Sequence, residues 1–148
     1  MKGNLSYIKI DANKILPFEN EEFDFILSVD TIEHLENPWV FVEEIHRILK
    51  VNGTVILTTP NVENLVSRIL YLLFGQFMSF NNGLLKVNHI SPIFSWIFDF
   101  MISKKFKIKK TYYYPGHYLF LSARICNLRL PFKNKYFGEN IVRKMKKI

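Results

Sequence analysis

Short apolar runs in the first sixty residues predict strands, and a segment with helical spacing lies between two of them. Residues 6–11, Ser-Tyr-Ile-Lys-Ile-Asp, alternate apolar and polar positions, which is typical of a half-exposed strand. Residues 23–29 and 54–59 are short, apolar runs, so we expect two buried strands there. The helix between them is predicted from apolar residues on one face: Trp39, Val42, Ile45 and Leu49.

Capping residues indicate where two helices begin and end. Asn37 is a favourable N-cap and Pro38 suits a first helical turn, so we expect the first helix to begin there and to end near Lys50. Asn61 is expected to cap a second helix, which Gly75 stops. The chain therefore alternates strands and helices up to this glycine.

The C-terminal half continues with a loop, a helix and two strands. Residues 76–88 contain three Asn and one Gly and predict a loop, whereas residues 91–103, which open with Ser-Pro, predict a helix. Residues 106–114 and 118–125 have the composition of strands. Because the turn at residues 115–117 is Pro-Gly-His, these strands are expected to form an antiparallel hairpin.

This order of elements predicts an α/β fold, a Rossmann-like mixed sheet with helices on both faces and a C-terminal antiparallel β-hairpin. Strands that are linked by helices pair in parallel, and the hairpin makes the sheet mixed. Ligands of such sheets bind outside the carboxyl ends of the strands. Small and polar residues occupy the first three strand ends, namely Asp11-Ala12, Ser28-Val29-Asp30 and Thr58-Thr59-Pro60.

Composition and charge narrow the class of protein. The chain has 148 residues, a net charge of +7 and a single cysteine, Cys126, so one domain in a reducing, cytoplasmic compartment is expected. Residues 11–44 hold ten acidic residues and one basic residue, which argues against a nucleic-acid partner. Residues 131–148 are expected to be a solvated basic tail. A peripheral protein, which contacts an anionic membrane weakly through this tail and the apolar residues 65–74, stays open as an alternative.

Several short motifs follow one another in residues 5–61: Asp11-Ala12, Leu16-Pro17-Phe18, Phe23-Asp24, Glu33-His34-Leu35, Arg47-Ile48-Leu49-Lys50, Asn52-Gly53 and Thr59-Pro60-Asn61. In this order and spacing they resemble class I S-adenosylmethionine-dependent methyltransferases of the small-molecule branch, related to quinone- and polysaccharide-modifying enzymes. The resemblance implies a partial methyltransferase domain over residues 1–130, with S-adenosylmethionine as cofactor and a small-molecule, glycan or lipid-like acceptor. It also implies a seven-stranded sheet whose last strand is antiparallel.

The resemblance assigns cofactor roles to two strand ends. Asp11 matches the position whose carboxylate accepts a hydrogen bond from the adenine amino group, and Ala12 matches the backbone N–H that meets the ring. Ser28 and Val29 match the strand end whose backbone faces the methionine amino group. An ordinary turn or strand end remains the alternative at each position.

The family's glycine-rich turn and the acid that binds the ribose have no counterpart before residue 6, where Gly3 is the only glycine. The sequence is therefore expected to begin at the family's third strand, as an N-terminally truncated domain. Such a domain leaves the edge of the strand at residues 23–29 unpaired, and an open apolar edge favours pairing with another chain. We expect a homodimer, a separately encoded N-terminal half or a rearranged docking of the first strand. A non-catalytic remnant or protein-binding subunit is the competing interpretation, so enzymatic activity stays open.

Three residues are candidates for acid–base chemistry on an acceptor. Glu33 and His34 form an adjacent pair before the first helix, and His89 lies in the loop where an acceptor would enter. A purely structural role in the loop is the alternative for the pair. The four histidines show no local spacing suited to zinc, so no metal site is expected from the sequence.

Overall fold

The computed structural model describes residues 6–83, 88–115 and 133–148. They form one four-stranded sheet in the order β1-β2-β4-β3. The strands are β1 (Phe23–Ser28), β2 (Leu49–Pro60), β3 (Phe106–Pro115) and β4 (Gly138–Lys147). The helices are η1 (Ile32–His34), α1 (Pro38–Ile48), α2 (Leu65–Phe74) and α3 (Ser95–Ile102). β1 and β2 are parallel, whereas β4 is antiparallel to both of its neighbours. The mixed α/β sheet and its antiparallel last strand are thus confirmed.

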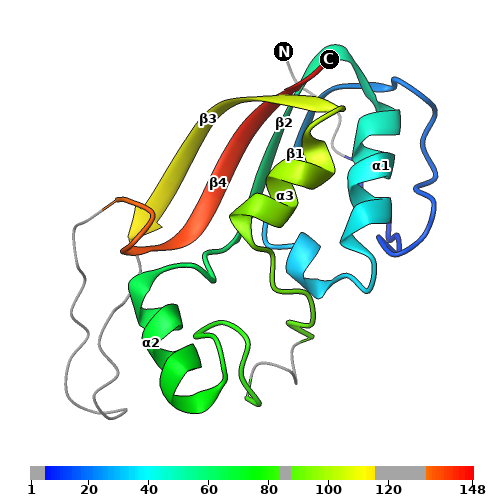
Figure 1. Cartoon of the computed structure of the whole chain (residues 1–148). Helices are drawn as coiled ribbons and strands as arrows, with labels where there is room; N and C mark the ends of the chain where they lie inside the picture. Colours follow the sequence, from blue (N-terminus) through cyan, green and yellow to red (C-terminus); the bar gives the residue numbers. More distant parts are fainter. Residues whose placement is uncertain (1–5, 84–87, 116–132) are drawn as a thin grey trace.

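The core lies between one face of this sheet and the helices α1 and α3 (Figure 1). Alternate residues of β2 point to that face, because successive side chains of a strand point to opposite sides. Val55 and Leu57 are buried there against Ile45 of α1 and Phe98 of α3. Of the predicted helical face, Val42 and Ile45 are buried in this core, whereas Trp39 is 47% exposed and Leu49 is already the first residue of β2.

The opposite face of the sheet carries a shallow, largely apolar groove. Its lining includes Ile56 of β2, Val142 of β4 and Tyr112 of β3, and it contains no residue of a described helix. Figure 1 shows α1 and α3 on the other side, with α2 beyond one end of the sheet. Helices were expected on both faces, and among the described residues they cover one.

β4 corrects the expectation of a solvated basic tail. Residues 138–147 lie between β2 and β3, and alternate side chains of this strand are buried. Ile141 and Met145 are apolar and enter the covered face, while the Arg143 side chain pairs with Asp99. The strand pattern was not visible in the sequence because the charged residues Arg143 and Lys147 occupy two of the buried positions. Arg and Lys can do so by burying their aliphatic stems while their charged groups stay paired. The strand partner expected at residues 118–125 lies outside the described residues.

Residues 6–11 are a strand that the sequence predicted wrongly. They form no strand and pair with no strand among the described residues, and Tyr7 is 88% exposed. β1 has an open edge in the described sheet, yet these residues do not pair with it. A period-2 pattern becomes a strand only where a neighbouring strand supplies hydrogen-bonding partners.

Two helix starts lie later than the sequence predicted. Asn64, and not Asn61, caps α2, and its side chain accepts a hydrogen bond from the Ser67 backbone N–H at 2.8 Å. α3 begins at Ser95, because Ser91 is held in another contact by its hydroxyl, which donates to the Leu35 carbonyl at 2.5 Å. The predicted cap of α1 at Asn37 is confirmed, as is the stop of α2 by Gly75 in the left-handed conformation.

Arg47 of α1 connects the N-terminal loop to the core. Its guanidinium group donates to both carboxylate oxygens of Glu44 and to the carbonyls of Leu16 and Phe18. Glu44 also accepts from the Leu16 backbone N–H at 2.8 Å. The hydrogen bonds from Arg47 hold the pKa of the Glu44 carboxyl below its usual value.

We expect this network to make stability fall in acid. A carboxyl whose pKa is lowered by folding stabilises the protein above its unfolded pKa of about 4.3, and this stabilisation is lost as the pH falls through the folded value. Glu44→Gln should therefore make the free energy of unfolding less dependent on pH between about 5 and 3, as followed by urea denaturation. Glu43→Gln, at the exposed neighbour that pairs with Lys105, is the matched control and should keep the parental slope. Equal slopes for the two variants would contradict the assignment.

No helix within the described ranges is long and apolar enough to cross a membrane.

Candidate active site

The carboxyl ends of β1 and β2 are joined by side-chain hydrogen bonds. The Thr58 hydroxyl donates to the Asp30 carboxylate at 2.7 Å and accepts from the Asp30 backbone N–H at 2.9 Å. Asp30 has a φ of 45°, a left-handed conformation that is uncommon outside glycine and that this double contact stabilises. The turn places η1 directly beside the end of β2. Two of the three predicted strand ends therefore meet, as expected for parallel neighbours.

Glu33 is the buried carboxylate of this region. Glu33 is 0% exposed, and its Oε2 atom accepts a hydrogen bond from the Thr59 hydroxyl at 3.2 Å. The other oxygen, Oε1, is buried and has no hydrogen-bond partner among the described residues. Burial raises the pKa of Glu33 to about 6, and the negative charge of Asp30 adds to this effect. A buried oxygen without a partner is uncommon and points to a missing ligand or a functional role.

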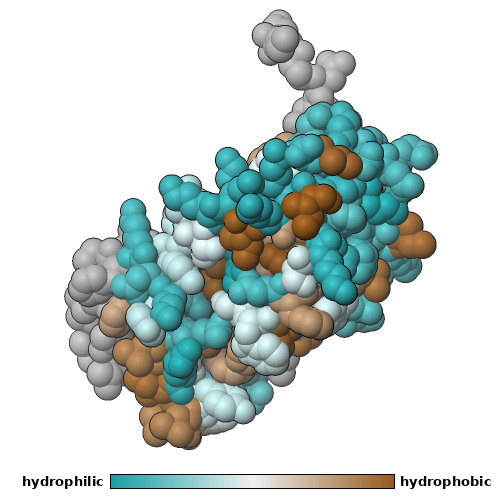
Figure 2. All heavy atoms as spheres, turned by 45° about the horizontal axis from the view of Figure 1, so that its top comes forward, coloured by the Kyte–Doolittle hydropathy of each residue, from teal (hydrophilic) through white to brown (hydrophobic). Residues whose placement is uncertain are grey.

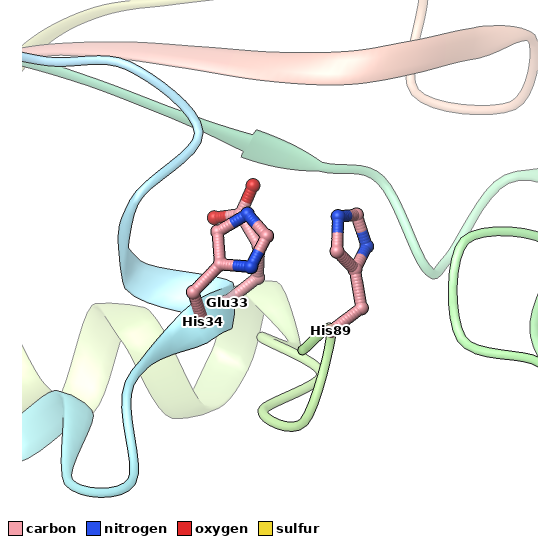
Figure 3. Close-up of side chains that lie close together, drawn as sticks. All are labelled: Glu33, His34 and His89. Atoms are coloured by element: carbon pink, nitrogen blue, oxygen red, sulfur yellow. The ribbon is translucent and has the colours of Figure 1, made fainter. Parts of the chain in front are cut away.

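The segment that carries His89 is attached to η1 by its backbone. The carbonyl oxygen of Glu33 accepts from the backbone N–H groups of Ile90 and Ser91, each at 3.0 Å. The imidazole ring of His89 then lies against that of His34, with ring centroids 4.6 Å apart and planes at 84°. Figure 3 shows the two rings and the Glu33 carboxylate facing one another. The three residues proposed from sequence for acid–base chemistry thus form one cluster.

The hydrogen bonds at Nδ1 determine which nitrogen of each ring is available. His34 Nδ1 lies 3.1 Å from the Asn88 carbonyl, and His89 Nδ1 lies 2.8 Å from the Ser79 carbonyl. Because a carbonyl oxygen can only accept, each Nδ1 carries the proton in these contacts. In the neutral rings both Nε2 atoms therefore have a free lone pair. One donor atom from each of Glu33, His34 and His89 lies within 4.8 Å of the others.

Three of the residues that the resemblance assigned to the cofactor line two grooves, and neither groove is lined by Glu33, His34 or His89. Ala12 and Ser28 line a groove along β1, and the hydroxyl of Ser28 is buried without a hydrogen-bond partner in the described part of the chain. Val29 is 55% exposed and lines the groove on the opposite face of the sheet. Asp11 is exposed, and the hydrogen bond from the Asn13 backbone N–H lowers the pKa of its carboxyl.

Sequence reasoning missed the partners that organise the cluster. Thr58 and Thr59 stood in a strand end that was singled out, but their contacts with Asp30 and Glu33 depend on strand pairing. Local spacing also gave no sign of a metal-compatible group, because His89 is distant from His34 in the sequence. A third histidine, His46, packs its ring on Phe106 and does not belong to this cluster.

Comparison with known proteins gives a match to one family model over part of the chain and a likeness in fold to solved structures. Residues 1–57 match the family model of a methyltransferase domain. An uncharacterized protein of Methanocaldococcus jannaschii is 48% identical over 42 residues, which is 28% of this chain and 20% of that protein. The mitochondrial ubiquinone biosynthesis O-methyltransferase of Dictyostelium discoideum is 30% identical over 59 residues, which is 39% of this chain and 18% of that enzyme. The chain thus spans about a fifth of the length of these curated relatives in its matches.

Solved structures extend the likeness to the whole chain. A SAM-dependent methyltransferase of Thermotoga maritima superposes with a TM-score of 0.67 at 20% identity, over 95% of this chain and 63% of that one. A SAM-dependent methyltransferase of Archaeoglobus fulgidus gives a TM-score of 0.63 at 15% identity, over 99% of this chain and 69% of that one. At these identities the likeness establishes the fold.

Proposed function

We propose that the chain takes part in methyl transfer from S-adenosylmethionine, because residues 1–57 match the family model of a methyltransferase domain and the chain shares its fold with solved SAM-dependent methyltransferases. The acceptor is a small molecule, a glycan or a lipid-like compound. The cofactor site is completed by a segment that carries a glycine-rich turn and is supplied by a second chain.

The arrangement of the strand ends is the observation that carries this proposal. β1 and β2 are parallel neighbours, and their carboxyl ends hold Asp30, Glu33 and Thr59 side by side. Ligands of doubly wound sheets bind outside the carboxyl ends of parallel strands. The methyl group of a sulfonium is already activated, so a site there has mainly to align the acceptor atom with the methyl carbon.

Four residues are proposed to contact the cofactor. The Asp11 carboxylate is exposed and charged at neutral pH, so it is able to accept a hydrogen bond from the adenine amino group. Ala12 offers its backbone N–H to the ring. Ser28 and Val29 offer backbone groups to the methionine amino group at the end of β1. Ala12 and Ser28 line the same groove, which supports placing the cofactor along this strand.

The same groove supports completion by a second chain. β1 is an edge strand of the described sheet, and its Phe25 and Leu27 side chains are more than half exposed. An exposed apolar edge strand is a template for pairing with another strand. We therefore propose that another copy of the chain or a separately encoded N-terminal half pairs here and brings the glycine-rich turn.

The surface of α2 supports an acceptor with an apolar part. Leu72, Leu73 and Phe74 are each more than 60% exposed, while the polar Ser67 of the same helix is buried. Figure 2 shows a hydrophobic cluster at the end of the molecule where α2 lies in Figure 1. Exposed apolar residues beside a polar surface favour contact with lipid-like molecules. A lipid-like acceptor or a weak contact with an anionic membrane is consistent with this surface.

Glu33, His34 and His89 are proposed to act on the acceptor. If the acceptor is a hydroxyl, its proton must leave as the oxygen attacks the methyl carbon, and a neutral imidazole Nε2 is able to receive it. The buried Glu33 carboxylate would then stabilise the protonated ring that results.

The test is to follow radiolabelled S-adenosylmethionine through size-exclusion chromatography of the purified chain, alone and after co-expression with the neighbouring upstream reading frame. We expect the label to elute with an assembly heavier than the 17.6 kDa monomer. Asp11→Asn should weaken binding at least about tenfold, the size expected for one charged hydrogen bond. Asp24→Asn is the matched control, at an exposed carboxylate that pairs with Lys50.

Retention of the label by the monomer at micromolar cofactor would contradict the need for a second chain. No retention in any fraction would favour a non-catalytic, protein-binding role and would overturn the proposal.

A further inference from the structure

We propose that Glu33, His34 and His89 form a binding site for a divalent transition-metal ion of the zinc type. The carboxylate and the two imidazoles come from η1 and from the segment before α3, and one donor atom of each lies within 4.8 Å of the others. Two imidazoles and one carboxylate are the protein ligands of many catalytic zinc sites, which keep a fourth position open. Imidazole ligands favour zinc over magnesium or calcium, which prefer sites made of oxygen atoms.

The histidines are already oriented for metal binding. Both Nδ1 atoms lie at hydrogen-bond distance from a backbone carbonyl, His34 at Asn88 and His89 at Ser79. A metal-bound histidine nearly always donates its other ring N–H to such an acceptor, which fixes the tautomer and the ring direction. The Nε2 lone pairs are the ones left for a metal.

The buried carboxylate supplies the second, independent observation. Glu33 Oε1 has no hydrogen-bond partner among the described residues although the residue is 0% exposed. The other oxygen is occupied by Thr59, so the carboxylate is held in place while Oε1 stays available. A cation beside Oε1 would compensate for the loss of hydration at this oxygen.

The three donor atoms have to move only slightly closer together to bind one ion. Ligand atoms about 2.0–2.2 Å from a tetrahedral zinc ion lie about 3.4 Å from one another. The donor atoms here are within 4.8 Å, so side-chain rotations bring them to that spacing. The backbone of both segments is fixed by the hydrogen bonds of Ile90 and Ser91 to the Glu33 carbonyl, so the site need not be assembled from separate parts.

The open fourth position gives the metal a role in the reaction, and this role rests on the proposed function. An acceptor hydroxyl bound there would lose its proton to water, because a bound metal occupies the Nε2 lone pairs that would receive this proton in the metal-free site. Its oxygen would form a bond to the methyl carbon while the bond between methyl and sulfur breaks, and S-adenosylhomocysteine would leave. Metal binding itself does not depend on this step.

Calorimetric titration of the untagged chain with zinc chloride, after treatment with a chelator, tests the site. We expect one ion per chain with a dissociation constant in the micromolar range or below. Glu33→Gln, His34→Phe and His89→Phe should each weaken binding at least about tenfold, because loss of even a supporting group costs about 10–100-fold. His46→Phe is the matched control, because its ring lies on Phe106 outside the cluster, and it should bind zinc like the parent.

Substitution of cobalt for zinc adds a readout of geometry. The visible absorption of a tetrahedral cobalt site should appear with the parent and with His46→Phe, and should disappear with His89→Phe, while circular dichroism reports that each variant is folded. Absence of zinc binding by the parent, or equal affinity for the parent and all three ligand variants, would overturn the proposal. Cofactor retention is measured separately, so zinc binding without it would refute the proposed function and leave the metal site standing.

Discussion

Replacing Phe98 by alanine is expected to lower the free energy of unfolding by about 3–5 kcal/mol, as measured by urea denaturation followed by circular dichroism. Phe98 is 2% exposed and lies in the core cluster between α3 and the sheet. Removal of its ring leaves a cavity that neighbouring side chains fill only in part. Since domains are stable by about 5–15 kcal/mol, this one substitution would remove a large part of the total.

The environment of Phe98 adds to the effect. The guanidinium group of Arg143 lies 4.9 Å from the centroid of the ring and pairs with Asp99 on the same helix. Loss of the ring removes the surface against which this buried arginine packs. Phe100→Ala is the matched control, because Phe100 belongs to the same helix but is 71% exposed, and it should change stability by less than about 0.5 kcal/mol. Similar losses for both variants would show that α3 does not bury Phe98 as described.

Arg47→Met is expected to lower the free energy of unfolding in the same assay, and by clearly more than the loss of an exposed arginine that lacks such a network. The substitution keeps most of the side-chain volume and removes the hydrogen bonds to Glu44 and to the loop carbonyls of Leu16 and Phe18. The Glu44 carboxylate, which is 11% exposed, would then remain charged without its main partner. Removing one partner of a largely buried pair costs more than removing both.

A double-mutant cycle separates the ion pair from the other contacts of Arg47. In a Glu44→Gln background, Arg47→Met should cost less than it does in the parent, because no unpaired charge is left behind. Arg68→Met is a control for the loss of an arginine, since Arg68 is exposed and should change stability only slightly. If Arg47→Met lowers the free energy of unfolding equally in the two backgrounds, Arg47 stabilises the protein through its hydrogen bonds to the carbonyls alone.

The first half of the fold was predictable because its patterns are local. β1, α1 and β2 follow from short apolar runs and a helical stripe, and the Asn37 cap follows from residue type. β4 was not recognised, because Arg143 and Lys147 concealed the period of two that Ile141 and Met145 carry. Burial of these cations depends on Asp99 and on Glu21, which no local pattern connects to them.

The candidate site was predictable in its members and not in its geometry. Glu33, His34 and His89 were each singled out as a chemically active type near a strand end or an entry loop. Their grouping depends on the backbone contacts of residues 90 and 91 with Glu33, which link segments more than fifty residues apart. The orphaned carboxylate oxygen follows from burial, which is a property of the packed chain.

The place of β4 has a consequence for the order of events during synthesis. β2 and β3 do not pair with each other, so they are joined into one sheet only through β4. When the ribosome has synthesised the chain only as far as about residue 115, β1 and β2 can pair but β3 has no partner. The apolar side chains of these strands then face water. Both edges that β4 will occupy are then open to other nascent chains. Chaperone binding should therefore be greatest between the emergence of β3 and that of β4, and should end when the latter leaves the exit tunnel.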